Sequence, residues 1–284
     1  MKRKMLFWLV LIIVLGPVCA QENQQDIDVS PLSGKDWSKK KIFRSVEWYK
    51  LKDNELFGEP QSINVIKINL KKNEYDVSVV FSDSTRVLLS EMATKQKALA
   101  AINGTFFDMK KGGSVVFLKS GDKIITSPNP DAPVIVREAA FTVGDSVRIA
   151  AFPKNDWKNW QANYKEIMVS GPLLIKQGEC IEPDSTAFTV TKHPRSAIGI
   201  TSDYELLFVT ADGRHENKAS GLSIKELGLL MKALNCKDAM NLDGGGSTTL
   251  WSNKKGVLNF PSDNKVFDHE GARTIANGII ISKN

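Results

Sequence analysis

Most of the chain alternates apolar and polar residues or forms short runs rich in β-branched side chains. Such runs, bounded by Gly, Pro, Asn or Asp, are typical of strands. They occupy residues 62–70, 75–82, 98–102, 115–118, 134–137, 140–143, 147–152, 171–175, 197–201, 206–211 and 275–282. The polar residues 71–74 between the first two runs predict a hairpin.

One long helix is well defined by the sequence. Ser223 and Glu226 form a capping box, and apolar residues at helical spacing follow them up to Leu234. Residues 90–96 predict a second, short helix. Because strands outnumber helices, we expect an α+β fold: a mixed, strand-rich sheet domain with the long helix in a local βαβ unit.

The strand-like runs on either side of this helix both end in Asp-Gly. Asp212 follows the run 206–211, and Asp243 precedes Gly-Gly-Gly-Ser-Thr-Thr. A helical crossover favours parallel strands, so both carboxylates are expected at one sheet edge, beyond the ends of strands that lie about 4.8 Å apart if they are neighbours. This predicts a carboxylate pair. The alternative is that each Asp only caps backbone N–H groups in a common turn.

Other loops add candidate ligands to this edge. Three successive glycines are costly to order, which indicates close approach to a ligand or an unusual bend. Asn103 and Gly104 end another apolar run, where a simple Asn-Gly turn is the alternative. Arg195 and Arg273 precede strand-like runs, and their guanidinium groups suit phosphate or carboxylate unless they lie on the surface.

The N-terminus has a different pattern. Three cations at positions 2–4 precede an apolar run and small residues before Gln21, so residues 1–20 predict a signal peptide. Residues 21–45 predict a polar tether, and residues 46–284 a single domain. We therefore expect a secreted or periplasmic protein without stable membrane insertion after cleavage. A lipid anchor at Cys19 is the competing interpretation, which the neighbouring Pro and Val disfavour.

Composition narrows the classes of function. The 284 residues are 42% hydrophobic and 25% charged, which is enough for a substantial core. Loss of the signal peptide lowers the formal charge from +6 to +3, which gives little support to nucleic-acid binding. The sequence has no P-loop, zinc, EF-hand or Gly-x-Ser-x-Gly pattern, so we expect no metal and no cofactor. Whether Cys180 and Cys236 pair is left open.

Six motifs, in this order, resemble those of the phosphodiester glycosidase family. They are NGTFF at 103–107, SGPLL at 170–174, RSAIG at 195–199, ADGR at 211–214, NLDGGGS at 241–247, and Arg273. The resemblance implies an enzyme that cleaves a sugar-1-phosphodiester at the anomeric carbon, releasing the sugar and leaving a phosphomonoester. The known animal member removes N-acetylglucosamine from a mannose phosphate, so the resemblance implies an N-acetylglucosaminidase-like enzyme acting on a glycan or sugar phosphate.

A mechanism consistent with these residues gives each a role. Arg195, Arg273 and the backbone N–H groups of the turn 244–247 would hold the phosphate leaving group. Asp243 or Asp212 would stabilise the oxocarbenium-like centre as nucleophile or as base for water, with Glu216 as a reserve acid. Asn103 would bind a sugar hydroxyl. The expected substrate-binding set is Asn103, Gly104, Thr105, Arg195, Arg214, Gly244, Gly245, Gly246, Ser247 and Arg273.

Two other functions fit the same loops. A non-catalytic domain would bind a sugar phosphate or an exported polysaccharide. Trp157, Trp160 and Tyr164 would be its aromatic platforms, although their spacing is more typical of the buried face of a short helix. A phosphodiesterase would instead cleave the P–O bond and release sugar 1-phosphate.

Overall fold

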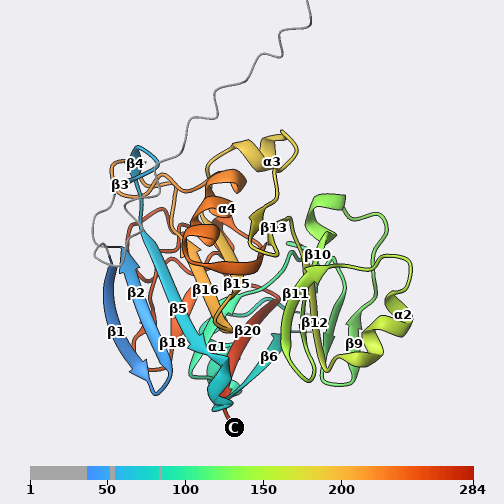
Figure 1. Cartoon of the computed structure of the whole chain (residues 1–284). Coiled ribbons are helices and arrows are strands. Elements are labelled where there is room, and N and C mark those ends of the chain that lie inside the picture. The colour runs from blue at the N-terminus through green and yellow to red at the C-terminus, as the bar shows by residue number, and fades with distance from the viewer. Residues whose placement is uncertain (1–36, 52–54, 83–84) are drawn as a thin grey trace, which may run out of the picture.

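The computed structural model describes residues 37–51, 55–82 and 85–284 (Figure 1). They form three sheets and a two-stranded ribbon with few helices, which confirms the strand-rich α+β fold. The predicted signal peptide and residues 21–36 of the predicted tether lie outside the described residues. Among the described residues, no helix is long and apolar enough to cross a membrane.

The largest sheet has eight strands in the order β1-β2-β5-β16-β15-β17-β13-β14. Each strand in it pairs antiparallel with its neighbours. Its strands are β1 (Trp37–Phe43), β2 (Val46–Leu51), β5 (Ile63–Asn69), β13 (Leu173–Lys176), β14 (Glu179–Cys180), β15 (Arg195–Thr201), β16 (Glu205–Ala211) and β17 (Cys236–Asn241).

The predicted βαβ unit is present, but a third strand lies inside it. Helix α4 (Ile224–Ala233) joins β16 to β17, which run parallel because each pairs antiparallel with β15. The idea that Asp212 and Asp243 end neighbouring strands is therefore wrong. A helical crossover sets the relative direction of two strands and still leaves room for another between them.

Two five-stranded sheets complete the domain. The second sheet, in order, is β11 (Val147–Ala151), β10 (Ala139–Val143), β12 (Glu166–Ser170), β8 (Leu118–Ser120) and β9 (Lys123–Thr126). The third is β19 (Gly256–Val257), β18 (Leu250–Ser252), β7 (Ala100–Asn103), β20 (Asn277–Lys283) and β6 (Tyr75–Phe81). The ribbon is β3 (Glu55–Leu56) with β4 (Glu59–Pro60).

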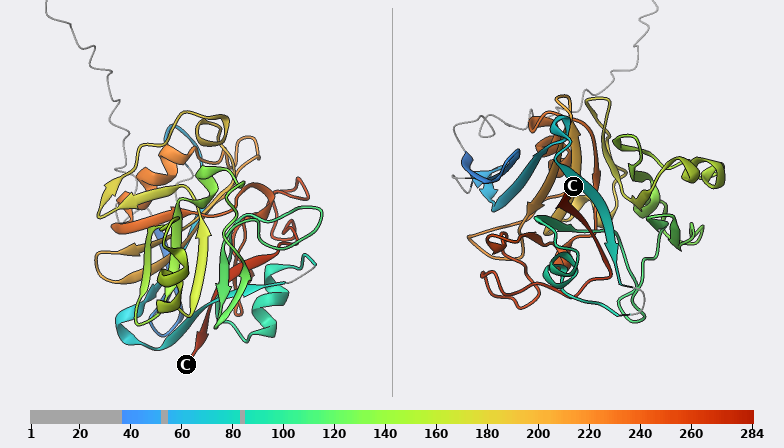
Figure 2. Two further views of the ribbon diagram at one scale, coloured as in Figure 1. Left: turned by 90° about the vertical axis from the view of Figure 1, so that its right-hand side faces the viewer. Right: turned by 90° about the horizontal axis from the view of Figure 1, so that it is seen from below.

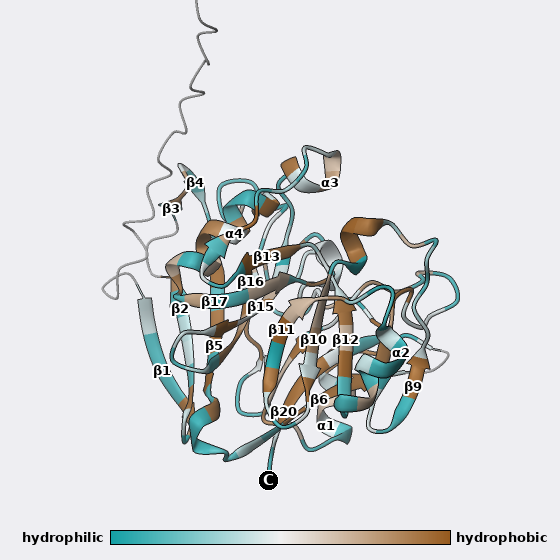
Figure 3. Ribbon diagram, turned by 45° about the vertical axis from the view of Figure 1, so that its right-hand side comes forward, coloured by the Kyte–Doolittle hydropathy of each residue, from teal (hydrophilic) through white to brown (hydrophobic). Residues whose placement is uncertain are grey.

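The three sheets pack together (Figure 2), and apolar residues from all three meet in one main core. Phe208 of the large sheet, Phe141 and Met168 of the second, and Ile102 and Ile279 of the third are fully buried there. Figure 3 shows hydrophobic residues concentrated in inner strands such as β12 and hydrophilic residues along much of β1. This joint core fixes how the loops of different sheets meet.

Helix α4 packs against the large sheet at β13 and β17. The capping box is confirmed, because Ser223 Oγ accepts from Glu226 N–H at 3.2 Å and Glu226 Oε2 accepts from Ser223 N–H at 2.8 Å. Its residues Leu227, Leu230 and Met231 are buried in a second cluster. The other helices are α1 (Leu89–Lys95), which confirms the short helix, α2 (Trp157–Trp160), α3 (Ala187–Val190), η2 (Leu70–Lys72), η3 (Val134–Arg137), η4 (Gln161–Asn163) and η5 (Gly245–Ser247).

Two predicted β features are wrong, and of the predicted strand 115–118 only Leu118 lies in a strand, β8. Residues 71–74 form no hairpin, because β5 and β6 belong to different sheets and the chain turns between them through η2 and Asn73, at φ 46°. The β-branched run 134–137 is the 3-10 turn η3, whose Arg137 donates to the carbonyls of Ala132 and Pro130. Strand propensity says nothing about the partner a strand will find.

The domain begins before the predicted boundary at residue 46. Trp37 and Ile42 of β1 are buried, and β1 pairs with β2. Three exposed lysines at 39–41 interrupt the apolar pattern, as is common in edge strands. The tether interpretation is therefore wrong for residues 37–45.

The aromatic residues considered as sugar platforms pack inward. Trp157 meets Phe117 edge-on at 5.3 Å between ring centroids, and Trp160 and Tyr164 pack at 4.9 Å. All three join a cluster on the second sheet. This supports the buried-face interpretation. Cys180 and Cys236 are free thiols.

Candidate active site

Asp243 follows β17 and is held by the end of β7 in the third sheet. Its N–H donates to the Gly104 carbonyl at 3.0 Å, and its own carbonyl accepts from Asn103 Nδ2 at 2.7 Å. Its Oδ1 accepts from the N–H of Gly244 at 2.9 Å. Two sheets therefore fix the backbone that carries this carboxylate.

The three glycines after Asp243 are required by close contacts. A Cβ on Gly244 would lie 2.7 Å from the Pro194 carbonyl oxygen. Gly245 has φ +61°, where side chains are strained. A Cβ on Gly246 would lie 2.5 Å from Arg273 Nη2. The glycines thus let a strand and an arginine approach the backbone.

Two guanidinium groups lie on this turn. Arg214 Nη2 is 2.9 Å from the Cβ position of Gly245, and the side chain of Arg214 is exposed. Arg273 donates through Nε to Asp263 Oδ1 at 3.0 Å and lies over Gly246. The structure therefore brings Arg214 and Arg273 to the turn that follows Asp243.

The electrostatics of Asp243 suit acid–base chemistry. Burial raises the pKa of its carboxyl, while the Ser247 hydroxyl, the Gly244 N–H and Arg273 lower it in part. A carboxyl pKa shifted upward brings the group closer to neutrality, where it exchanges protons efficiently. Burial also lowers the pKa of His193, and the nearby charges of Arg195 and Arg214 lower it further. The two arginines thus place positive charge near His193.

Asn103 is a buried link between strands. Its Oδ1 accepts from Ser196 Oγ at 2.6 Å and from Thr249 N–H at 3.0 Å. With its bond to the Asp243 carbonyl, both ends of the amide are occupied within the protein. Its geometry supports positioning of Asp243 more than contact with a sugar hydroxyl. Thr105 beside it is buried, and its hydroxyl has no partner among the described residues.

Asp212 has a different environment from Asp243. Its Oδ2 accepts from Ser62 Oγ at 2.7 Å, and its Oδ1 accepts from Asn259 Nδ2 and Phe260 N–H, each at 2.9 Å. Burial raises the pKa of this carboxyl, and the same three donors lower it in part. Both oxygens are engaged, which supports an anchoring role for Asp212 over the catalytic role considered from the sequence.

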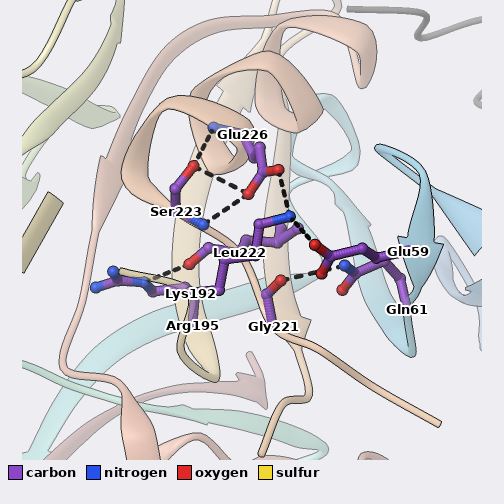
Figure 4. A network of polar contacts seen from close by, with 8 residues as sticks. All are labelled: Glu59, Gln61, Lys192, Arg195, Gly221, Leu222, Ser223 and Glu226. Atoms are coloured by element: carbon purple, nitrogen blue, oxygen red, sulfur yellow. Dashed lines mark hydrogen bonds and ion pairs between the residues drawn. The ribbon is translucent and has the colours of Figure 1, made fainter. Parts of the chain in front are cut away.

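Arg195 also points into the protein. Its Nε donates to the Leu222 carbonyl at 2.9 Å, beside the Lys192 ion pairs with Glu59 and Glu226 (Figure 4). Its Nη2 donates to two further carbonyls, in and after α3. Burial lowers the pKa of Arg195 to about 10, with a further contribution from Arg214, so it stays a cation at neutral pH. Only Nη1 is left to face a phosphate.

The backbone of the turn offers fewer donors than the sequence predicts. The N–H groups of Gly244, Gly245 and Ser247 donate to Asp243 Oδ1, the Pro194 carbonyl and the Gly244 carbonyl. We expected the backbone N–H groups of 244–247 to hold a phosphate together. This expectation is corrected, because three of the four N–H groups donate to acceptors within the protein. Glu216 is exposed on the loop after Arg214.

Three further residues shape the site and were missed from the sequence. Asn259 bonds Asp212 and the Thr248 carbonyl, and Asp263 pairs with Arg273. Asn277 Oδ1 accepts from Thr105 N–H at 2.7 Å. Asn277 could have been noticed, because it precedes Gly278 in an Asn-Gly pair like that at 103. Asn259 and Asp263 have no neighbouring motif that would mark them. In the described part of the chain, no three His, Cys, Asp or Glu side chains form a metal-binding group.

Residues 96–282 match the family described as phosphodiester glycosidase. The chain belongs to this family. It is 27% identical over 189 residues to the mouse N-acetylglucosamine-1-phosphodiester alpha-N-acetylglucosaminidase, covering 63% of this chain and 36% of the mouse enzyme. It is 26% identical over 191 residues to the uncharacterized SPbeta prophage-derived protein YomE of Bacillus subtilis, covering 63% of this chain and 28% of that protein. The matches thus span about a third of these relatives.

Solved structures show the same fold. The zebrafish N-acetylglucosamine-1-phosphodiester alpha-N-acetylglucosaminidase catalytic domain, auto-inhibited by its pro-peptide, superposes with a TM-score of 0.67 at 20% identity. That similarity covers 87% of this chain and 86% of the zebrafish domain. A hypothetical protein from Synechocystis gives a TM-score of 0.65 at 16% identity, covering 87% of this chain and 64% of that one. The chain therefore has both the sequence pattern and the fold of the phosphodiester glycosidase family.

Proposed function

We propose that this protein hydrolyses a sugar-1-phosphodiester at the anomeric carbon and releases a free sugar and a phosphomonoester. Membership of the phosphodiester glycosidase family supports a hydrolase of sugar phosphodiesters. The observation that carries the finer proposal is the turn 243–246. There the Asp243 carboxylate contacts Gly244, and the guanidinium groups of two arginines lie against Gly245 and Gly246. In such an arrangement the carboxylate can stabilise the anomeric carbon as it becomes positive, and the arginines can stabilise the leaving phosphate.

The reaction follows from these charges. The C–O bond at the anomeric carbon breaks, and its electron pair leaves with the phosphate beside Arg214 and Arg273. The group that leaves is the phosphomonoester anion, which has a low proton affinity and so needs little protonation. Asp243 supports the positive anomeric centre and either accepts a proton from the attacking water or forms a glycosyl ester that water hydrolyses. The anomer released first, read by NMR, separates these two routes.

In this proposal Asp212 and Asn103 do not touch the reacting atoms and act by holding other residues in position. Asn103 fixes the backbone of Asp243 from β7, and Asp212 fixes residues 259 and 260. Glu216, exposed on its loop, remains a candidate acid for a substrate that needs protonation. The N-terminal pattern of residues 1–20 supports export to the periplasm or the medium, where exopolysaccharide and other glycans are the substrates we expect.

The test is product identity. The chain from Gln21 is incubated with N-acetylglucosamine-1-phospho-methyl-mannoside in ¹⁸O-water, and mass spectrometry follows the products. Free N-acetylglucosamine with an unlabelled phosphomonoester supports cleavage at the anomeric carbon. Label in phosphate contradicts it and identifies P–O cleavage. Tight binding without turnover of this or related diesters identifies a binding protein.

A further inference from the structure

The two arginines on the turn differ in their ionic partners. Asp263 Oδ1 accepts from Arg273 Nε at 3.0 Å and also from Arg273 Nη2, so one carboxylate oxygen takes two donors of the guanidinium. Among the described residues, Arg214 makes no ion pair with Asp or Glu. The protein therefore neutralises one cation of the turn and leaves the other to a ligand.

The Asp263 carboxylate lies on the turn itself. A Cβ on Gly246 would lie 2.5 Å from Asp263 Oδ1, the same distance as from Arg273 Nη2. Arg273 is also close enough to Asp243 to lower the pKa of that carboxyl. Because hydrogen bonds are about 2.9 Å long, a phosphate on the guanidinium of Arg273 lies roughly 5–8 Å from the charge of Asp263.

Asp263 leaves part of Arg273 available to a ligand. A guanidinium has five N–H donors, and the Asp263 contact uses two of them. Arg273 Nη1 lies 4.0 Å from the sulfur of Met109, which is only a weak acceptor. The side chain of Arg273 is 25% exposed. Arg273 can therefore bind a phosphate while it still holds Asp263, so the carboxylate stays beside the bound anion.

This negative charge affects the product more than the substrate. A phosphodiester carries one negative charge, whereas the phosphomonoester released from it gains a second with a pKa near 6. Two arginines without a carboxylate would hold the dianion more tightly than the monoanion and would retain the product. At 5–8 Å and partial exposure, the repulsion between Asp263 and one added charge changes affinity about tenfold.

We propose that Asp263 sets the charge preference of this phosphate site: it disfavours the dianionic phosphomonoester relative to the monoanionic diester and so favours release of the product. This inference rests on the proposed function, because it places the phosphate at Arg214 and Arg273. Asp263 acts through its own charge and through Arg273, and it takes no part in breaking the C–O bond.

The test uses two ligands that differ in charge, methyl-mannoside 6-phosphate and its methyl phosphodiester. Neither carries phosphate on an anomeric carbon, so neither is a substrate of the proposed reaction. Calorimetry gives the ratio of their dissociation constants at pH 8 and at pH 5. We expect Asp263→Asn to shift this ratio about tenfold in favour of the monoester at pH 8. At pH 5, where the monoester has lost its second charge, the shift should be less than about threefold.

The ratio removes effects that are unrelated to charge preference. A displaced Arg273 would weaken both ligands alike at both pH values. His193 and His215 are present in every variant, so their titration cancels when variants are compared. Asp268→Asn is the matched control, because Asp268 lies in the same loop and bonds Asn264 Nδ2 and the Glu270 N–H instead of an arginine. It should keep the wild-type ratio at both pH values.

The outcomes separate the two proposals. An unchanged ratio at pH 8 in folded Asp263→Asn overturns the charge preference, as does binding of neither ligand to the wild type. An equal shift at both pH values also overturns it and makes Asp263 a support for Arg273 alone. Hydrolysis of N-acetylglucosamine-1-phospho-methyl-mannoside is measured separately. If the wild type does not cleave this diester, the proposed function fails, and a shift confined to pH 8 still supports the role of Asp263.

Discussion

Asp212 and Asp243 end two parallel strands of one sheet, each is followed by glycine, and burial raises the pKa of each carboxyl. Their partners differ. Asp212 accepts from a Ser hydroxyl, an Asn amide and a backbone N–H, which occupy both oxygens. Asp243 accepts from the Gly244 N–H through Oδ1, and the Ser247 hydroxyl and Arg273 lower its pKa in part. Both residues share the Asp-Gly motif and the direction of the pKa shift. The comparison therefore teaches that the number of hydrogen bonds its oxygens accept from the protein best separates an anchoring carboxylate from a reactive one.

The largest expected effect is loss of turnover in Asp243→Asn. The amide keeps the shape of the side chain but cannot act as nucleophile or base, so kcat/KM should fall by about 10³-fold or more, or about 4 kcal/mol. Hydrolysis of N-acetylglucosamine-1-phospho-methyl-mannoside measures it. Asp238→Asn, on the same strand and bonded to Gln177 N–H, is the control. Retention of more than a third of the activity would contradict a chemical role for Asp243.

Asp212→Ala should mainly lower stability. The change leaves three buried donors without an acceptor, which costs on the order of 3 kcal/mol of unfolding free energy. Urea unfolding followed by circular dichroism measures the loss. If Asp212→Ala unfolds at the wild-type urea concentration yet has no turnover, Asp212 is the reactive carboxylate and the comparison is reversed.

Arg214→Ala should weaken substrate binding. Arg214 is exposed and lies on Gly245, and a charge-assisted bond to phosphate contributes about 1.5–3 kcal/mol, so KM should rise about 10- to 100-fold. Steady-state kinetics on the same diester measure this change. Arg148→Ala, on edge strand β11, serves as the control, and an unchanged KM in Arg214→Ala would place the phosphate elsewhere.

Arg273→Gln should shift the pH profile of kcat to higher pH. Arg273 favours the ionised form of Asp243 and so lowers the pKa of that carboxyl. Its removal, which also leaves Asp263 without its cation, raises the pKa of Asp243. The pH limb that reports Asp243 therefore shifts to higher pH, whether the group acts as base or as acid. A shift to lower pH would show that another group controls this limb.

The smallest expected effect is on the pH dependence of stability. The folded pKa of Asp243 is raised above its ordinary value, so the folded protein holds the proton more tightly than the unfolded chain. The resulting stabilisation is present at low pH and is lost as pH rises through the raised pKa. Asp243→Asn should therefore lose less unfolding free energy than the wild type between pH 4 and pH 8, measured in urea. A steeper loss in Asp243→Asn would contradict burial as the cause.

Local sequence was a good guide where the physics is local. The capping box at Ser223 predicted α4, and runs that alternate or are rich in β-formers predicted strands such as β5 and β16. Partner choice depends on distant chain segments, so neither the separation of β5 from β6 nor the insertion of β15 between β16 and β17 was visible. The edge strand β1 was missed because its exposed lysines hide its period.

The same limit applies to the site. Asp243, Arg214 and Arg273 could be proposed from the sequence because a glycine run and guanidinium groups carry their own chemical signal, and they stay predictions. Arg195 was expected on the phosphate, yet most of its donors bind carbonyls, because nothing in its neighbours along the chain reveals which acceptors lie opposite. Asn259 has no motif at all, and its importance comes only from facing Asp212.

The bonds that hold the loops around the candidate site join distant parts of the chain. Asn103 and Asp243 are 140 positions apart, Ser62 and Asp212 are 150 apart, and Thr105 and Asn277 are 172 apart. Contacts of such long sequence separation form late in folding, because large loops must close first. During refolding, strand structure should therefore return before turnover does, and the first appearance of free sugar would time the closing of the last loops.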